Sequence, residues 1–279
     1  MKDDVAKIYS MNLEVRDDCI GGTVTLVGAG PGDMDLITVR GERALSVADV
    51  ILYDSLIDQR LLENRSAALV YVGKRCGRHG MTQEQITALL IRFARSGKNI
   101  VRLKGGDPSV FGRVGEECLA LAAAKVKFEI IPGVSSAIAV PALAAIPLTH
   151  RGVSDGLVVV TAHKRLGFEE LGLPVYRKET SLVLLMALST IDKWQPQLLQ
   201  LGYPEDVPVA FIVEGCTQNE YVVESSIGDA LVDALDERLH SPCLVVIGEV
   251  VTLRAKLRPW LINRSLLEAR SLPRQAQMS

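Results

Sequence analysis

The sequence predicts an α/β protein made of two α/β domains with mainly parallel or mixed sheets. The chain has 279 residues, about twice the length of a typical domain. Apolar, β-branched runs alternate with segments of helical period, and this alternation restarts after a linker at 146–152. Strands that alternate with helices in this way form mainly parallel sheets with helices on both faces.

The first half of the chain alternates regularly. Its apolar runs predict strands at 23–28, 50–53, 69–72, 100–103 and 128–131, and the segments between them predict helices at 38–48, 82–95, 115–125 and 134–144. Thr82 and Gln85 form a capping box that opens the second helix, and Gly97 ends it.

The second half predicts strands at 157–161, 181–186, 209–213, 221–224 and 244–247, with helices at 191–201 and 227–239. We therefore expect an N-terminal extension (1–21), an N-terminal domain (22–146), a C-terminal domain (147–253) and a C-terminal extension (254–279). The last segment is rich in arginine. We expect a solvated amphipathic helix with a frayed end there, with a basic arm as the alternative.

Composition excludes several classes of protein. Lys and Arg number 31 against 33 Asp and Glu, a net charge of −2, which argues against a protein that coats nucleic acid. The apolar runs are far shorter than the about 20 residues of a membrane span, and no signal peptide is visible, so we expect a cytoplasmic protein without a membrane partner. The five cysteines and four histidines show no paired spacing, so no disulfide framework or metal site is predicted.

Two glycine loops follow predicted strands. The segment 28–32, GAGPG, fails the dinucleotide fingerprint because Asp33 stands where the final glycine is needed, and no GxxxxGK[ST] motif occurs. The segment 104–108, KGGDP, leaves the fourth strand at its carboxyl end, where ligands bind in open α/β sheets. Its paired glycines allow close approach to the backbone, and Asp107 offers an acceptor for an ammonium or hydroxyl group of a ligand. Alone, this loop is equally well explained as a structural turn.

Seven segments occur in one order along the chain. They are VGAGPGDMDLITVRG from Val27, YDSLI from Tyr53, VGKRCGRH from Val72, RLKGGDPSVFGRVGEE from Arg102, PGVSSA from Pro132, IPLTHRG from Ile146 and SPCLVVIGEVV from Ser241. Together they resemble the tetrapyrrole methylase family, and within it the branch that methylates uroporphyrinogen III. Ser109 and Val114 stand where this family often has Phe and commonly has Gly, and the second departure bears on the local shape near Arg113.

The resemblance implies that S-adenosylmethionine is the methyl donor, with S-adenosylhomocysteine as product, bound in a cleft between the two domains. The positions that it implies for cofactor binding are Pro31, Gly105, Gly106, Asp107, Val110, Ser135, Ser136, Met186 and Gly215. On spacing alone, Met186 is better explained as a core methionine.

The resemblance also implies that the substrate is uroporphyrinogen III, methylated at two ring carbons, C2 and C7, to give precorrin-2 by way of precorrin-1. Arginines grip carboxylates such as those of this macrocycle with two parallel hydrogen bonds. Arg113, Arg151 and Lys74 are therefore candidate anchors, with Arg113 oriented by Glu116 or Glu117. The neighbouring Arg75 and Arg78 are expected in a solvated loop.

The reaction is substitution at a sulfonium methyl group, after which a proton must leave the macrocycle. The family places an acid/base pair at Asp54 and Lys74. Each of these residues also fits a simpler role, Asp54 as a helix cap and Lys74 as a carboxylate anchor. Arg113 is a further candidate base, but its high pKa favours the anchoring role.

Three alternatives compete with this activity: methylation of a later corrinoid, methylation of RNA or protein by an enzyme of the same fold, and a non-catalytic binding module. The net charge of −2 and the absence of an aromatic and basic patch argue against RNA. The resemblance further implies a homodimer. It leaves open whether the product serves sirohaem, corrinoid or haem d1 synthesis.

Overall fold

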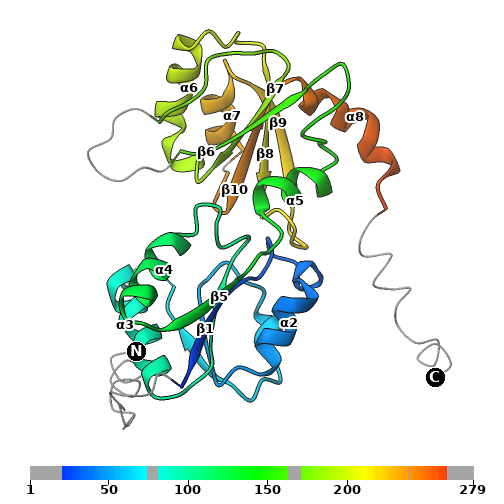
Figure 1. The fold of residues 1–279 in the computed structure, drawn as a ribbon. Coiled ribbons are helices and arrows are strands. Elements are labelled where there is room, and N and C mark those ends of the chain that lie inside the picture. The colour runs from blue at the N-terminus through cyan, green and yellow to red at the C-terminus, as the bar shows by residue number, and fades with distance from the viewer. Residues whose placement is uncertain (1–20, 74–80, 163–170, 238, 263–279) are drawn as a thin grey trace, which may run out of the picture. The chain divides into compact units, whose positions relative to one another are not determined.

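A computed structural model describes residues 21–73, 81–162, 171–237 and 239–262. The chain divides into two compact units, Met1–Ala139 (unit 1) and Val140–Ser279 (unit 2), whose elements are coloured along the chain in Figure 1. Each unit contains one five-stranded sheet and its own helices, so the predicted α/β class is confirmed. Within the described ranges, no helix is long and apolar enough to cross a membrane.

The described part of unit 1 contains five strands and the helices between them. The strands are β1 (Thr23–Gly28), β2 (Val50–Tyr53), β3 (Ala68–Tyr71), β4 (Ile100–Lys104) and β5 (Lys127–Ile131). The α-helices are α2 (Val39–Ser46), α3 (Gln83–Arg95) and α4 (Val114–Ala123), and the short 3-10 helices are η1 (Met34–Leu36) and η2 (Gln59–Leu62). A further helix, α5 (Ser136–Leu143), begins in unit 1 and ends in unit 2. The predicted capping box at Thr82 and Gln85 is present at the start of α3.

The sheet of unit 1 is entirely parallel, in the order β3-β2-β4-β1-β5. In its register Gly28 lies beside Lys104, Val27 beside Ile131, and Tyr53 beside both Leu103 and Tyr71. The carboxyl ends of all five strands therefore lie along one edge of the sheet.

Helices cover both faces of this sheet. Leu45 of α2 packs with Val27 and Leu103 on one face, and Phe93 of α3 and Leu121 of α4 pack on the other face in a second buried cluster. Successive strand residues point to opposite faces, so each buried strand must be apolar on both. This requirement explains the apolar run of β2, whereas Thr23 and Thr25 occur in β1 and two basic residues, Arg102 and Lys104, interrupt β4.

Unit 2 contains the remaining five strands. They are β6 (Gly156–Thr161), β7 (Thr180–Leu185), β8 (Pro208–Val213), β9 (Tyr221–Ser226) and β10 (Cys243–Ile247). The α-helices are α6 (Ile191–Gln200), α7 (Ala230–Asp236) and α8 (Arg254–Leu257), and the 3-10 helices are η3 (Leu188–Thr190), η4 (Glu249–Leu253) and η5 (Arg258–Trp260). The buried Trp194 of α6 and Phe211 of β8 pack at the centre of its core, with ring centroids 6.5 Å apart.

The sheet of unit 2 is mixed, in the order β6-β7-β10-β8-β9. Only β6 and β7 pair in parallel, whereas β10 runs antiparallel to both of its neighbours and β8 runs antiparallel to β9. A short loop connects β8 to β9, too short for the crossover that two neighbouring parallel strands need. The predicted fold class, mainly parallel or mixed sheets, is confirmed: the sheet of unit 1 is parallel and that of unit 2 is mixed.

The two units divide at Ala139 and Val140, inside α5, whereas the sequence pattern places the boundary between residues 146 and 147. Contacts of the second half of α5 explain the difference. A Cβ added at Gly215 would lie 2.4 Å from Cγ1 of Val140, so Val140 packs tightly against the loop after β8. At the other end of unit 2, Arg254 is buried and donates to Glu224 over 2.8 Å, so this first residue of the expected C-terminal extension is not solvated.

Candidate active site

The sheet edge where β1 and β4 end is a topological switch point. These two strands are neighbours, yet α2 after β1 covers one face of the sheet and α4 after β4 covers the other (Figure 1). In open α/β sheets, ligands bind outside the carboxyl ends of the strands at such a point. Both glycine loops begin there, because residues 28–32 follow β1 and residues 104–108 follow β4.

The two glycine loops are joined by backbone hydrogen bonds. Gly106 N donates to Gly30 O over 2.7 Å, Gly30 N donates to Gly106 O over 3.3 Å, and Ala29 N donates to Lys104 O over 2.8 Å. The loops therefore form one surface at the sheet edge.

Glycine is required at this surface for two different reasons. Gly106 has φ +67°, a left-handed conformation that costs other residues about 1–2 kcal/mol. A Cβ added there would be 3.7 Å from Ser136 N, which is ordinary contact, so the backbone of Gly106 is open on that side. At Gly28, by contrast, an added Cβ would lie 2.5 Å from Gly133 Cα, because the ends of β1 and β5 are in close contact. The open backbone beside Gly106 fits the close approach of a ligand.

Asp107 connects the loop after β4 to the segment after β5. Its Oδ2 accepts from Gly133 N over 2.9 Å, and its Oδ1 accepts from Ser109 N over 2.7 Å and from the Ser109 hydroxyl. The sequence interpretation assigned this carboxylate to a ligand. In the structure it also holds the protein backbone and so keeps the loop in shape, and its contact with a ligand stays a prediction.

The other candidate cofactor residues of unit 1 lie at the same edge. Pro31 stands between Gly30 and Gly32, both of which have positive φ angles. Ser135 caps the start of α5: its Oγ accepts from Ala137 N over 3.3 Å and its carbonyl accepts from Ile138 N over 3.1 Å. Val110 is exposed in the segment after Asp107.

Arg113 ends the segment that follows this loop and precedes the first turn of α4. Phe111 and Arg113 both have left-handed backbones, with φ +52° and +58°. Arg113 donates from Nε and Nη2 to the two carboxylate oxygens of Glu116, over 2.9 and 2.6 Å. This hydrogen-bonded carboxylate raises the pKa of Arg113 above its ordinary value, which makes the guanidinium a still weaker base. Glu116 rather than Glu117 is therefore the partner of Arg113.

Asp54 follows β2 and is partly buried. Its Oδ1 accepts from Leu56 N over 3.4 Å within a turn, and its Oδ2 accepts from Arg102 Nη2 over 3.3 Å. The next helix, η2, is capped by Asp58, so Asp54 is not the helix cap that the sequence left open. Lys74 lies outside the described residues, as do Arg75 and Arg78, so its pairing with Asp54 stays a prediction.

Sequence reasoning missed the buried charged residues Arg102 and Lys104 of β4. It named Glu117 of α4 only as a possible partner of Arg113 and did not foresee that Glu117 is buried against these two residues. Glu117 accepts from Arg102 Nε over 3.4 Å and from Lys104 Nζ over 3.2 Å. Burial is the largest cause that lowers the pKa of Lys104, and the nearby positive charge of Arg102 lowers it further. The sequence did contain a signal of buried charge, because two basic residues interrupt the apolar run of β4. It does not show which acidic group faces them.

Candidate residues of unit 2 also gather at one sheet edge. Met186 follows β7 and Gly215 follows β8, two strands that run in the same direction on either side of β10. Met186 is 49% exposed and has φ +55°, so the interpretation as a core methionine is wrong. Gly215 lies between Glu214 and Cys216, which also have positive φ angles. Strained backbone of this kind is concentrated at functional sites.

Arg151 is exposed at a turn of unit 2. The turn is closed by backbone hydrogen bonds of 3.0 and 2.9 Å between His150 and Ser154. The side chain is available for an anionic ligand, and the anchoring role remains a prediction.

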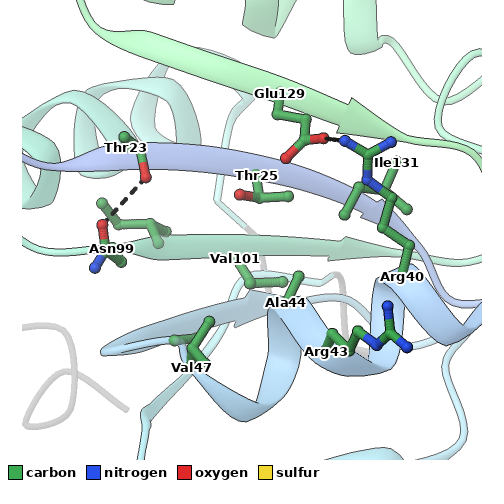
Figure 2. Close-up of a pocket in the computed structure, with 12 residues that line it drawn as sticks. Thr23, Thr25, Arg40, Arg43, Ala44, Val47, Asn99, Val101, Glu129 and Ile131 are labelled. Carbon is green, nitrogen blue, oxygen red and sulfur yellow. Dashed lines mark hydrogen bonds and ion pairs between the residues drawn. The ribbon is translucent and has the colours of Figure 1, made fainter.

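A groove of about 480 Å³ in unit 1 lies elsewhere (Figure 2). It runs between α2 and the sheet, beside the first halves of β1 and β4, and its polar lining includes Thr23, Arg43 and an Arg40–Glu129 ion pair. None of the candidate residues that the structure describes lines it. We therefore do not place the candidate site in this groove. The candidate site is at the paired glycine loops of the switch point.

Comparison with known proteins identifies the family. The family model for tetrapyrrole (corrin/porphyrin) methylases matches residues 23–231. The chain is 44% identical over 236 residues to a uroporphyrinogen-III C-methyltransferase of Methanocaldococcus jannaschii, covering 83% of this chain and 98% of the relative. It is also 42% identical over 244 residues to a siroheme synthase of Acinetobacter baylyi, which covers 86% of this chain but only 53% of that relative.

A solved structure is similar over nearly the same length. Uroporphyrin-III C-methyl transferase from Thermus thermophilus, complexed with S-adenyl homocysteine, is 38% identical, with a TM-score of 0.70 over 83% of this chain and all of that one. The chain belongs to the tetrapyrrole (corrin/porphyrin) methylase family.

Proposed function

We propose that this chain is an S-adenosylmethionine-dependent methyltransferase that adds two methyl groups to ring carbons of uroporphyrinogen III and so forms precorrin-2. The main support is the pair of joined glycine loops at the switch point of unit 1, where the backbone beside Gly106 is open to a ligand. The relative from M. jannaschii and the Thermus structure with bound S-adenyl homocysteine support the same assignment.

The residues that we assign to cofactor binding are Pro31, Gly105, Gly106, Asp107, Val110, Ser135, Ser136, Met186 and Gly215. When bound, S-adenosylmethionine supplies a methyl group on a positively charged sulfur. Backbone amides beside Gly106 suit the polar atoms of such a ligand, because the glycine lets them approach closely. Asp107 shapes this surface through Gly133 and Ser109.

The substrate carboxylates are bound by Arg113, Arg151 and Lys74 in this proposal. The two bonds from Arg113 to Glu116 use Nε and Nη2, and neither of them uses the two N–H groups of Nη1. Glu116 thus orients the guanidinium, and Nη1 is the donor that we assign to a carboxylate of the macrocycle.

The chemical step forms a carbon–carbon bond between a pyrrole carbon and the methyl group and breaks the bond from methyl to sulfur. The macrocycle then carries a positive charge until it releases a proton. Asp54 is the group to which we assign the proton, with Lys74 as its partner in the acid/base pair that the family resemblance implies. Arg102 donates to Asp54 Oδ2, which leaves the remaining lone pairs of the carboxylate available to accept a proton.

We also propose that the protein acts as a homodimer, as the family resemblance implies. Light scattering across a concentration series should give a mass near twice that of the 30.3 kDa chain. A mass that stays at one chain throughout would contradict the dimer without affecting the assigned reaction.

The assignment is tested by incubating the purified protein with S-adenosylmethionine labelled in the methyl group and with separate acceptors under reducing conditions. The acceptors are uroporphyrinogen III, a later corrinoid intermediate, and RNA. We expect label to enter uroporphyrinogen III fastest. Label that enters only the corrinoid or only RNA would favour the corresponding alternative and overturn the proposal.

A further inference from the structure

Four charged side chains meet beneath the candidate site, and they come from three separate segments. Asp54 follows β2, Arg102 and Lys104 lie on β4, and Glu117 lies in the first turn of α4. Arg102, Lys104 and Glu117 are 4%, 5% and 0% exposed. Buried charges are costly unless they are paired, and apolar residues of the same volume often stabilise a fold better. A cluster of this kind therefore calls for a role besides stability.

Glu117 is the centre of this cluster. Its Oε1 accepts from Arg102 Nε over 3.4 Å and from Gln83 Nε2 of α3 over 2.9 Å, and its Oε2 accepts from Lys104 Nζ over 3.2 Å. One carboxylate thus connects β4 with the first turns of α3 and α4. Moving or neutralising it changes three elements at once.

The cluster reaches the candidate catalytic groups in two directions. Arg102 donates to Asp54 Oδ2 over 3.3 Å, which fixes the direction of that carboxylate. On the other side, Glu117 directly follows Glu116, the partner of Arg113. A Cβ added at Gly112 would lie 3.3 Å from Lys104 Cε, so the lysine stem packs under the segment that carries Arg113.

The segment above Lys104 requires such support. Phe111 and Arg113 hold left-handed backbones, which persist in non-glycine residues only where the surroundings impose them. We propose that Arg102, Lys104 and Glu117 are positioning residues for methyl transfer. Arg102 orients Asp54, and Glu117 together with Lys104 holds the Arg113 segment. This inference rests on the proposed function and adds residues to which that function assigns no role.

The first test is a double-mutant cycle between Arg102 and Asp54. Arg102→Lys keeps the charge and shortens the reach, which avoids leaving Glu117 and Asp54 buried without a cation. We expect it to lower kcat for uroporphyrinogen III at least tenfold, with affinity for S-adenosylhomocysteine within twofold of the unmodified protein. In an Asp54→Asn background the same change should cost less than twofold, because there is no longer an aspartate to orient.

The second test measures binding in place of turnover. Glu117→Gln keeps the shape of the side chain and removes its charge. We expect it to weaken calorimetric binding of uroporphyrin III, the oxidised and stable form of the proposed substrate, at least fivefold. In an Arg113→Met background it should cause no further loss.

Arg65→Lys is the matched control. Arg65 is a mostly buried arginine of the same unit, with two hydrogen bonds of 2.7 and 2.8 Å to Glu42, and neither residue belongs to the candidate site. Thermal unfolding of every variant measures the loss of stability separately. The control should keep kcat and porphyrin affinity within twofold, whatever its unfolding midpoint.

The proposal would be overturned if the effects of the two substitutions multiply, as they do for independent residues, either in kcat for the Arg102 and Asp54 pair or in porphyrin affinity for the Glu117 and Arg113 pair. So would variants that lose thermal stability but keep both kcat and porphyrin affinity. Failure of the proposed function is distinct, since it appears as an unmodified protein that does not methylate uroporphyrinogen III.

Discussion

Gly30 and Gly106 exchange two backbone hydrogen bonds, with N···O distances of 2.7 and 3.3 Å, and so hold the loop after β1 against the loop after β4. This pairing occurs where the helices that follow the two strands diverge to opposite faces of the sheet. It places an open stretch of backbone at the position where α/β sheets bind ligands.

Gly106→Ala tests the importance of this surface. Alanine at φ +67° costs about 1–2 kcal/mol of strain, and the loop can relieve that strain only by breaking its pairing with Gly30. We expect the affinity for S-adenosylhomocysteine, measured by calorimetry, to fall by about tenfold. The matched control is Gly97→Ala, at φ +80° after α3, where an added Cβ meets nothing within 4 Å. Equal affinities of the two variants would show that the pairing does not matter for the cofactor.

Asp107 should act through the backbone that it holds. Asp107→Ala removes the acceptor for Gly133 N and Ser109 N, and hydrogen bonds to a charged group contribute about 1.5–3 kcal/mol each. We expect a lower unfolding midpoint and weaker binding of S-adenosylhomocysteine together. Asp107→Asn keeps one acceptor oxygen, so its unfolding midpoint and its affinity for S-adenosylhomocysteine should lie between those of Asp107→Ala and the unmodified protein. If Asp107→Ala binds S-adenosylhomocysteine as tightly as the unmodified protein, whether or not its unfolding midpoint is lower, this loop does not belong to the cofactor site.

Arg113 is expected to anchor the substrate. Arg113→Lys keeps the positive charge but loses the planar fork that holds Glu116, so it should chiefly raise KM. Arg113→Met should raise KM further while kcat stays measurable. Steady-state kinetics with saturating cofactor separates the two constants. Loss of turnover in both variants with normal porphyrin binding would instead make Arg113 the proton acceptor.

Tyr203 makes stability depend on pH in the alkaline range. This residue is buried, and burial raises its pKa from 10.0 to about 12. Between these values the unfolded chain has lost the phenol proton that the folded protein keeps, so the free energy of unfolding falls by about 1.4 kcal/mol per pH unit. Below about pH 10 the phenol is protonated in both states, so its full contribution to the free energy of unfolding is present there. Tyr203→Phe should therefore have a flatter decline of the unfolding midpoint from pH 10 to 12 than the unmodified protein, with a pH-independent offset below pH 10. Parallel declines would contradict the assignment to Tyr203.

The strands were readable from the sequence because burial on both faces leaves a continuous apolar run. The run at Val50–Tyr53 has the predicted bounds, and β1 agrees likewise. The predicted helix over 227–239 is shorter, Ala230–Asp236, because hydrophobic period alone does not mark where the turn after β9 ends. The antiparallel course of β10 was not predictable, since strand direction depends on how the whole unit is connected.

The site was readable only in part. The glycine loops stand out by composition, but the pairing of Gly30 with Gly106 depends on β1 and β4 being neighbours, which local sequence does not encode. The partner of Arg113 could be narrowed to two adjacent glutamates and no further. The burial of Glu117 follows from the phase of α4 against β4, a relationship between elements distant in the sequence.

The most direct measurement is the number and position of methyl groups transferred to one macrocycle. Uroporphyrinogen III would be incubated with the protein and S-adenosylmethionine carrying a ¹³C methyl group, and the product examined by mass spectrometry and ¹³C NMR. The expected product carries two labelled methyl groups on two different ring carbons, each bonded directly to carbon, and its formation requires both methyl donor and unmodified protein. A macrocycle without label, or with label on oxygen or nitrogen, would contradict the assigned reaction.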